Sequence, residues 1–198
     1  MFFMALIIAQ TQSARCAEPG GASEKLMATI ERPTTTIQVL QNFKFALDND
    51  LFLRDDFYTD ENLGKFFAAN KVFWYEMTPA RTSGFVYTQY SVGFSLIHGV
   101  MDEKGNVIAN GKKRGGGTIN AAVTADSIIE LFGKPMKITD PYATDNSRHP
   151  TPLIEKTHEL GNLAIEYRFD RPSSTASLNC TFHGDGTVKG CGFGNSEK

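Results

Sequence analysis

The sequence contains few of the residues from which metal sites and catalytic nucleophiles are built. Of its 198 residues, three are cysteine, four are histidine and one is tryptophan. It has no His-x-x-x-His or Cys-x-x-Cys pair, so the common zinc-binding patterns are absent. No pattern brings together a nucleophile, a base and an oxyanion site. We therefore expect a protein that is not an enzyme and that uses no metal and no cofactor.

A strong charge of one sign is also lacking. The chain has 20 Lys and Arg against 22 Asp and Glu, which gives a net charge of −2. Surfaces that bind nucleic acid or anionic membranes carry a basic excess, and this chain has none. With 41% hydrophobic residues and 15 phenylalanines, it has enough apolar side chains for a folded core. These numbers favour another protein as the partner, rather than nucleic acid.

The apolar run at residues 1–9 is too short to span a bilayer. It is followed by Ala14-Arg15-Cys16 and a polar stretch, which is typical of a signal peptide with a cleavage site between small residues. The lack of Lys or Arg before the run is unusual for a signal peptide. Two alternatives are a buried N-terminal strand and a lipid anchor on Cys16, although Arg15 stands where a lipoprotein signal has a small residue. We interpret residues 1–16 as a signal peptide, with no transmembrane segment in the mature chain, and expect a periplasmic or secreted protein.

Removal of residues 1–16 leaves one pair of cysteines, Cys180 and Cys191. Between them lies Asp185-Gly186, a strong signal for a two-residue hairpin turn. This turn would place Cys180 opposite Cys191 and Phe182 opposite Lys189. Facing residues of an antiparallel pair have Cα atoms roughly 4.5–5.5 Å apart, a distance that a disulfide bridges. We predict a Cys180–Cys191 disulfide and an oxidising compartment; the alternative is two buried free thiols in a cytosolic protein.

Two helix starts of the same design lie 65 residues apart, at Thr59 and Thr124. In both, a threonine caps the helix and acidic residues occupy the first turn. Each helix then has apolar residues at i, i+3 and i+4, which make one apolar face. These residues are Leu63, Phe66 and Phe67 in the first copy and Ile128, Leu131 and Phe132 in the second. Strand-like runs and a hairpin turn with an acid and a glycine follow each helix. The pattern predicts an α+β fold of two similar subdomains, each a short helical segment packed on a small antiparallel sheet.

The predicted organisation places a mobile lead-in after the signal peptide, at residues 17–33. The first α+β repeat then covers residues 34–111 and the second covers residues 119–198. Residues 112–118 (Lys-Lys-Arg-Gly-Gly-Gly-Thr) fall between them. Their spacing does not fit the phosphate-binding P-loop pattern, so we interpret them as a flexible, basic, glycine-rich linker.

The second repeat has features of a known family. They are the helix end Leu131-Phe132-Gly133-Lys134-Pro135, the alternating strand at residues 163–169 and the turn Asp185-Gly186-Thr187-Val188. With these features, residues 124–194 resemble the BamE (SmpA/OmlA) envelope family and the related fold of the β-lactamase inhibitor protein. The first repeat matches loosely, since it lacks the Gly-Lys-Pro stop and the Asp-Gly turn. The resemblance implies helices packed on an antiparallel sheet and a role in binding proteins. A tandem arrangement is more similar to the inhibitor.

These observations together predict an exported protein-binding module. Its sharpest form is an inhibitor or immunity protein that occludes a partner enzyme, such as a hydrolase or a toxin, in the cell envelope. The alternative is a BamE-like accessory factor in outer-membrane assembly. Two hairpin turns, the second held by the disulfide, would be presented rigidly to the partner. Phe73, Trp74 and Tyr75 cannot all face one core, because successive strand residues point to opposite faces, so one or more of them would be an exposed anchor. The predicted contact residues are Asp102, Glu103, Asn106, His183, Asp185 and Trp74.

Overall fold

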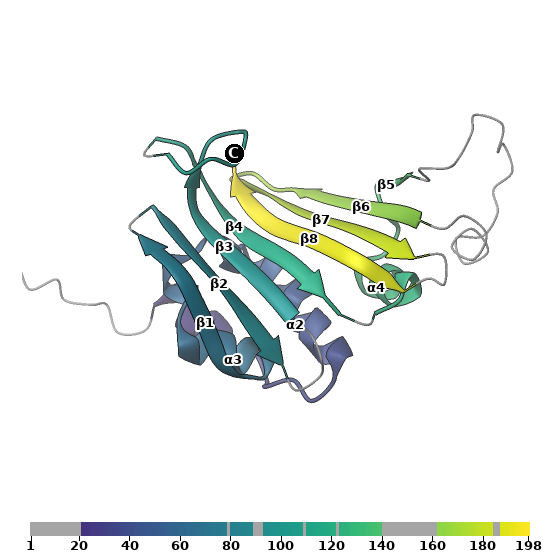
Figure 1. Cartoon of the computed structure of the whole chain (residues 1–198), viewed down its shortest axis with the longest axis horizontal. Helices are drawn as coiled ribbons and strands as arrows, with labels where there is room; N and C mark the ends of the chain where they lie inside the picture. The colour runs from purple at the N-terminus through teal and green to yellow at the C-terminus, as the bar shows by residue number, and fades with distance from the viewer. Residues whose placement is uncertain are drawn as a thin grey trace, which may run out of the picture.

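The protein is built on one antiparallel sheet of eight strands, in the order β1-β2-β3-β4-β8-β7-β6-β5 (Figure 1). The computed structural model describes residues 21–78, 80–88, 93–108, 110–121, 123–139, 162–183 and 187–198. The strands are β1 (Ala69–Thr78), β2 (Arg81–Thr88), β3 (Gly93–Met101), β4 (Lys112–Asn120), β5 (Lys137–Thr139), β6 (Asn162–Asp170), β7 (Ser174–His183) and β8 (Val188–Glu197). Strands β1 to β4 pair with their neighbours in chain order, as do β5 to β8, and β4 pairs with β8. The last strand of each set therefore joins the two sets into one sheet.

This continuous sheet shows that the prediction of two subdomains with separate small sheets is wrong. The predicted flexible linker, residues 112–118, is also wrong, because it lies within the central strand β4. Its glycines serve close packing rather than flexibility. A Cβ atom on Gly115 would collide with the carbonyl oxygen of Phe52, and one on Gly117 with the carbonyl oxygen of Ser95. Glycine is needed where another part of the backbone approaches a strand this closely.

Four helices pack on one face of the sheet (Figure 1). They are α1 (Ala22–Ala28), α2 (Thr36–Asp48), α3 (Asp60–Phe67) and α4 (Ala125–Phe132), and two short 3₁₀ helices, η1 (Leu51–Leu53) and η2 (Asp55–Phe57), connect α2 to α3. The structure confirms both predicted caps. Thr59 Oγ1 accepts a hydrogen bond from the Asn62 amide (3.1 Å), and Thr124 Oγ1 accepts one from the Ser127 amide (3.3 Å).

Helix α1 corrects another prediction, because it lies inside the segment expected to be a mobile lead-in. Its Met27 is only 3% exposed and belongs to the core. The Ser23 hydroxyl donates to the Asp56 carboxylate (2.6 Å) and accepts from Arg54 Nε (2.7 Å). These contacts attach α1 to η2, so the ordered structure begins before residue 34.

A single core joins the two sets of strands. Phe43 of α2 is fully buried, and its ring lies 6.4 Å from that of Phe94 on β3, 6.5 Å from Phe132 on α4 and 4.0 Å from Phe193 on β8. Along β7, every second residue from Ser174 to Phe182 is buried, as expected for a strand with one covered face. Because these aromatic rings come from both halves of the chain, neither half has a separate interior.

A polar cluster around Asp50 also connects the halves. Asp50, in the turn between α2 and η1, has a left-handed backbone (φ 53°). Its carboxylate accepts hydrogen bonds from Arg171 (2.7 Å), Ser174 (2.7 Å) and Asn195 (2.8 Å), which lie before β7, on β7 and on β8. Through these three hydrogen bonds, the Asp50 carboxylate holds the turn between α2 and η1 against the C-terminal strands.

The structure confirms the predicted disulfide. Cys180 on β7 faces Cys191 on β8, and their sulfur atoms are bonded. The predicted register holds for the next pair, Thr181 and Gly190, and is wrong at the pair after it, where Phe182 faces Val188 rather than Lys189. A β-bulge between Thr181 and Phe182 shifts the pairing there.

Candidate functional site: the outer face of the sheet

The face of the sheet opposite the helices is covered by no element among the described residues (Figure 1). An antiparallel sheet tolerates one face in water, and such faces usually carry scattered polar side chains. This one is organised into two distinct regions. One is a hollow over β4, β8 and β7, and the other is a group of aromatic rings on β1 and β2.

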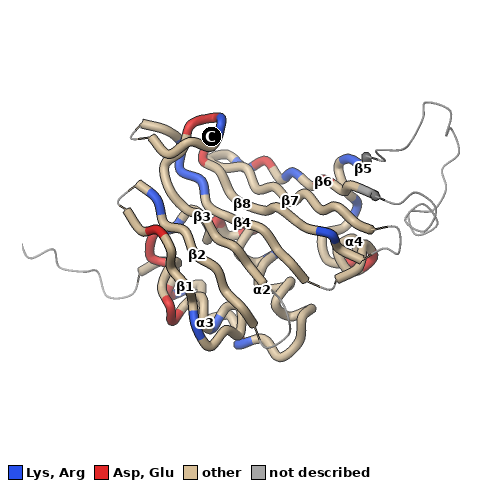
Figure 2. Tube along the Cα trace, viewed as in Figure 1, with Lys and Arg blue, Asp and Glu red and all other residues tan. Residues whose placement is uncertain are grey.

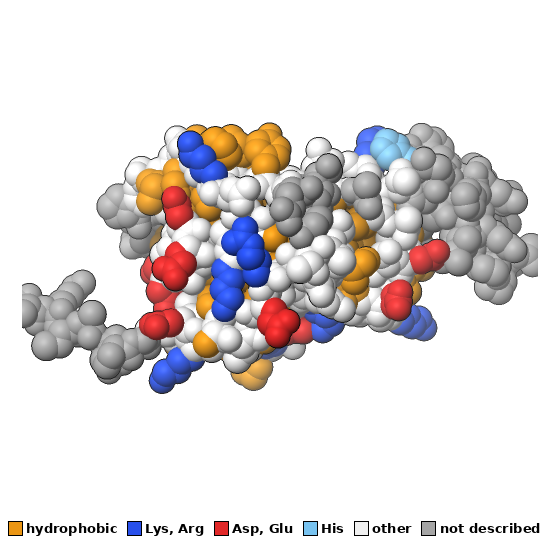
Figure 3. All heavy atoms as spheres, turned by 90° about the horizontal axis from the view of Figure 1, so that it is seen from below, with side chains coloured by type: hydrophobic (Ala, Val, Ile, Leu, Met, Phe, Trp, Pro, Cys, Tyr) orange, Lys and Arg blue, Asp and Glu red, His pale blue; other side chains and the backbone are white. Residues whose placement is uncertain are grey.

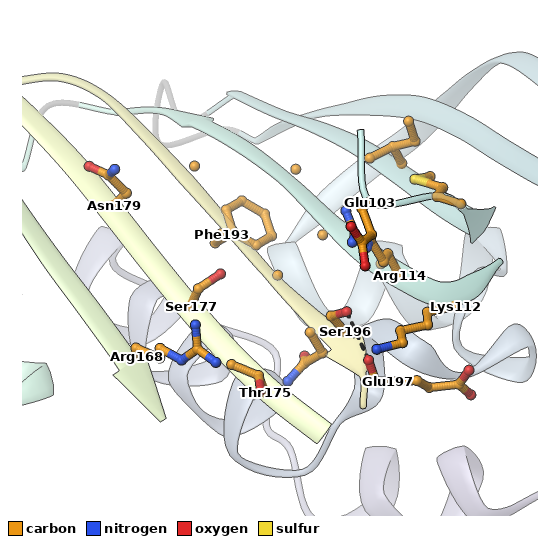
Figure 4. A pocket seen from close by; sticks show the side chains of 18 of the residues that line it. Glu103, Lys112, Arg114, Arg168, Thr175, Ser177, Asn179, Phe193, Ser196 and Glu197 are labelled. Atoms are coloured by element: carbon orange, nitrogen blue, oxygen red, sulfur yellow. Dashed lines mark hydrogen bonds between the residues drawn. The ribbon is translucent and has the colours of Figure 1, made fainter. Parts of the chain in front are cut away.

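The hollow, which we call the glycine groove, has a volume of about 990 Å³ (Figure 4). Its floor is formed by Gly116 on β4 and by Gly192 and Gly194 on β8, which alternate with the buried Cys191 and Phe193. Gly116 faces Gly194 in the β4–β8 pair. A Cβ atom built on Gly192 would have no neighbour within 4 Å. The missing side chain of Gly192 therefore leaves open space above the sheet, whereas Gly116 and Gly194 let β4 and β8 approach each other closely, since a Cβ atom on either would collide with the backbone of the other strand.

Neutral hydrogen-bonding side chains border this floor. Thr118 faces Gly192 across β4 and β8, while Ser177 and Asn179 of β7 face Gly194 and Gly192 from the other side. None of these three residues carries a charge, and all three line the groove. Together they offer donors and acceptors around a surface where a backbone segment of another molecule can approach closely.

Charged residues lie at the ends of the strands that form the groove (Figure 2). Lys112, Arg114 and Glu103 lie together at one end, and Arg168 lies across the groove from them (Figure 4). Arg168 is paired with Asp170, with 3.1 Å between Nε and Oδ2. Lys112 and Arg114 have no ion pair with any residue that the structure describes. The Nε atom of Arg114 is buried and has no hydrogen-bond partner in the described part of the chain.

The aromatic flank consists of Phe73 and Tyr75 on β1 and Phe85 and Tyr87 on β2. The Phe73 and Phe85 rings stack at 4.9 Å, Tyr75 lies 6.2 Å from Phe85, and Tyr87 lies 5.3 Å from Phe85. Phe73, Tyr75 and Tyr87 are 37%, 60% and 65% exposed. In Figure 3, which views the molecule from below, hydrophobic side chains gather at the upper left edge. Contiguous exposed apolar surface of this kind marks sites of interaction.

The aromatic flank and the groove lie on the same face and are close together. Across the strands, Phe73 faces Phe85, Phe85 faces Ser95, and Ser95 faces Thr118 at the border of the groove. Only β3 thus separates the flank from the groove-forming β4. A partner that covers the groove and extends over β3 also reaches the rings.

The structure places Trp74 away from this surface. Its indole packs against the core on the helix side, and its Nε1 donates to Asp60 Oδ1 of α3 (2.7 Å). Of the three adjacent rings Phe73, Trp74 and Tyr75, which cannot all face the core because successive strand residues point to opposite faces, we predicted Trp74 as the contact residue. Its neighbours Phe73 and Tyr75 are the residues that the outer face presents.

The first predicted turn, at residues 102–106, is held by its own hydrogen bonds. Asp102 accepts from the amides of Lys104 (2.9 Å) and Asn106 (2.8 Å) and from Asn106 Nδ2 (2.9 Å). The bond from the Asn106 side chain, followed by that from its amide, lowers the pKa of Asp102. Asp102 and Asn106 therefore shape the turn, whereas Glu103 lines the glycine groove.

The second predicted turn is described only in part. His183 ends β7 with an exposed side chain, and its amide donates to the Thr187 carbonyl (2.8 Å). Asp185 lies outside the described residues. A contact of His183 or Asp185 with a partner stays a prediction.

A buried histidine lies on the opposite side of β3. The His98 ring stacks on Tyr58 at 4.3 Å, and its Nε2 atom lies 3.5 Å from Asp55 Oδ1. Burial lowers the pKa of His98, as does Lys113, while Asp55 acts in the opposite direction. Burial also raises the pKa of Tyr58 well above its ordinary value. These groups fix η1 and η2 against the sheet and lie away from the glycine groove.

No family model, curated protein or solved structure matches this chain. The resemblance to the BamE family and to the β-lactamase inhibitor protein therefore stays a prediction from the sequence. Among the described residues, no group of three or more His, Cys, Asp or Glu is arranged to hold a metal ion. No helix within the described ranges is long and apolar enough to cross a membrane.

The sequence does contain a signal for the groove, although the predicted contact residues do not include it. Gly190, Gly192 and Gly194 recur at every second position of β8. This spacing places all three on one face of a strand. A stripe of glycines on a sheet face is compatible with close approach of another backbone or a ligand, whereas the predicted contact residues belong to turns and to an aromatic strand.

Proposed function

We propose that this chain is an exported protein-binding module that binds its partner on the outer face of the sheet. The observation that carries the proposal is the group of four contacting aromatic rings beside an open groove. Exposed rings of this kind supply much of the binding energy in protein interfaces. The sharper form of the proposal is an inhibitor or immunity protein that occludes an enzyme of the cell envelope.

The form of the groove supports a protein segment as its occupant. Its volume is near the upper end of the roughly 300–1,000 Å³ that pockets for small molecules occupy. It is a surface hollow bordered by neutral donors and acceptors such as Ser177, Asn179 and Thr118. These groups match the amides and carbonyls of an extended chain or a loop. The strands are fixed by neighbours on both sides, so little ordering cost is expected on binding.

Two observations support export. The Cys180–Cys191 disulfide persists in oxidising compartments such as the periplasm or the extracellular space. The N-terminal residues 1–16 have the composition of a signal peptide. We accordingly propose a periplasmic or secreted protein.

The test uses a pair of glycine variants on the same strand. Gly192→Tyr places a ring in the groove, and Gly190→Tyr places the same ring two residues away at a position that does not line it. Neither site has an atom within 4 Å of a built Cβ, so both variants should fold. Wild type and both variants would be used to capture proteins from an envelope extract of the source organism, with identification by mass spectrometry.

We expect wild type and Gly190→Tyr to retain one stoichiometric partner that Gly192→Tyr loses, with an affinity lower by about 100-fold, or roughly 3 kcal/mol. An enzyme partner whose activity falls on mixing would support the inhibitor. Outer-membrane assembly proteins would instead support the accessory-factor alternative. If all three proteins retain the same set, or none retains any, the outer face is not the binding surface and the proposal fails.

A further inference from the structure

We infer that the occupant of the glycine groove presents a carboxylate to Arg114, with Lys112 as a second cation beside it. This inference rests on the proposed function, because it names the chemistry of the segment that fills the groove. It commits to an acidic segment of a partner protein. A ligand can use those charged side chains around the groove that have no ion-pair partner within the protein.

Arg114 points its side chain into the groove from the outer face of β4. Its neighbours across the strands are Gly99 on β3 and Ser196 on β8, which are too small to cover a guanidinium group. The Nε atom is nevertheless buried and lacks a hydrogen-bond partner among the described residues. A buried donor without a partner costs free energy. The terminal nitrogens of the guanidinium are not among these buried atoms, so an acceptor on an occupant can reach them from the groove.

The other cations near the groove are already paired. Arg168 and Lys198 both lie near Asp170, at 3.1 and 3.7 Å. Lys113, whose side chain lies on the other face of β4, is paired with Asp55 at 2.8 Å. Lys112 and Arg114 thus stand out as the cations at the groove that have no ion pair with a described residue. Their charge is available to a ligand.

Two acidic residues of the groove must be considered beside these cations. Glu197 accepts a hydrogen bond from the Lys113 amide (2.9 Å) and is thereby oriented toward the strand end. Glu103 lies at the same end of the groove as Arg114 (Figure 4), but no ion pair joins them. Glu103 therefore opposes an incoming carboxylate through its charge without neutralising Arg114. Removal of the Glu103 charge should strengthen binding.

The geometry of the groups favours a carboxylate. A guanidinium group donates two parallel hydrogen bonds to a carboxylate, and it does so best where its position is fixed. The aromatic flank lies beyond β3 on the same face, so an occupant with an acidic residue and a nearby apolar residue would satisfy both regions. The direct probe is therefore the dipeptide N-acetyl-Phe-Asp-amide, with N-acetyl-Phe-Asn-amide as its uncharged isostere.

The experiment is a titration of the ¹⁵N-labelled protein with each dipeptide, followed by NMR. We expect the Nε–Hε resonance of Arg114 and the amides of Gly116, Gly192 and Gly194 to shift saturably with the Asp probe. Arg168 serves as the internal control, because its guanidinium is already paired with Asp170. Arg114→Gln should raise the dissociation constant by about tenfold, and Glu103→Gln should lower it. Equal shifts with the Asn probe, or equal shifts of Arg114 and Arg168, would overturn the inference.

A second arm separates this inference from the proposed function. With the partner captured by wild type, Lys112→Gln/Arg114→Gln should weaken its binding and reduce the dependence on salt, while Lys189→Gln, an exposed lysine outside the groove, should not. A partner lost by Gly192→Tyr but kept by the Lys112/Arg114 double variant would leave the proposed function in place and overturn the inference. Specific binding of the Asp probe without any groove-dependent partner would support the carboxylate site and contradict the proposed function.

Discussion

The two ends of the outer face are made from the same kind of strand and do different things. In β1–β2 and in β7–β8, alternate residues enter the core, and the pairs share antiparallel geometry. The outward residues include four aromatic rings in the first pair and are glycine, serine, threonine or asparagine along most of the second. The first arrangement supplies anchors, and the second supplies room for another chain. The outward residues of each strand, rather than the fold, thus decide the role of each end.

The pairs also differ in what holds them together. The Cys180–Cys191 disulfide connects β7 to β8 directly under the groove. Strands β1 and β2 are joined by ring contacts such as Phe73–Phe85 and by the ion pair between Arg81 and Glu76 (3.2 Å), neither of which is covalent. We therefore expect loss of the disulfide in β7–β8 to lower the stability of the protein. Loss of the exposed rings in β1–β2 should instead weaken binding and change stability little.

The largest effect on stability should come from the disulfide. In Cys180→Ala/Cys191→Ala, the loop that it closes is released, and we expect the free energy of unfolding to fall by about 3 kcal/mol. Urea denaturation followed by circular dichroism measures this change. Wild type under reducing conditions is the matched control and should show the same loss. Unchanged stability in both would mean that β7 and β8 do not depend on this bond.

The aromatic flank should show the reverse behaviour. Tyr75→Ala/Tyr87→Ala removes two rings that are mostly exposed, so stability should change by only about 0.5 kcal/mol. Binding of the captured partner should weaken by about 2 kcal/mol, roughly 30-fold, because exposed aromatic anchors dominate interface energies. Isothermal titration calorimetry gives the affinity. Ile37→Ala, on α2 at the other side of the molecule, is the control and should bind normally.

The smallest effect should be the pH dependence that His98 contributes. Its pKa in the folded protein lies below the ordinary value of 6.5, chiefly because of burial. The unfolded chain therefore binds a proton first as the pH falls, so the stability from neutral His98 is complete above pH 6.5 and is lost below it. Tyr58, Asp55, Lys113 and Glu197 are the titratable groups around it.

Denaturation at pH 7 and pH 5 tests this dependence. Wild type should lose stability over this interval, and His98→Gln should lose less. The Cys180→Ala/Cys191→Ala variant, altered in the other half of the sheet, should keep the wild-type dependence on pH. A steeper loss in His98→Gln would contradict the assigned direction of the pKa shift.

Local features of the fold could be predicted from the sequence. The caps at Thr59 and Thr124 depend on a few adjacent residues, and the Cys180–Cys191 bond follows from one short turn. The pairing of β4 with β8 brings together strands far apart in the chain, which no local pattern specifies. Residues 112–118 appeared flexible because glycine is common both in linkers and where backbones pack closely.

The candidate site could be predicted only in part. Glu103 was among the predicted contact residues, and it lines the groove. Trp74 was predicted as an anchor, but strand direction places Phe73 and Tyr75 on the outer face in its stead. Arg114 could not be identified from the sequence, because its lack of a partner depends on Gly99 and Ser196 in two neighbouring strands.

The most direct test of the central claim is hydroxyl-radical footprinting of the protein alone and with its captured partner. This measurement reports, residue by residue, which side chains the partner covers. If the outer face is the binding surface, Tyr75 and Tyr87 will be protected in the complex, while the exposed Ile37 on α2 will react as before. Protection of Ile37 with Tyr75 and Tyr87 still reactive would place the partner on the helices and contradict the account.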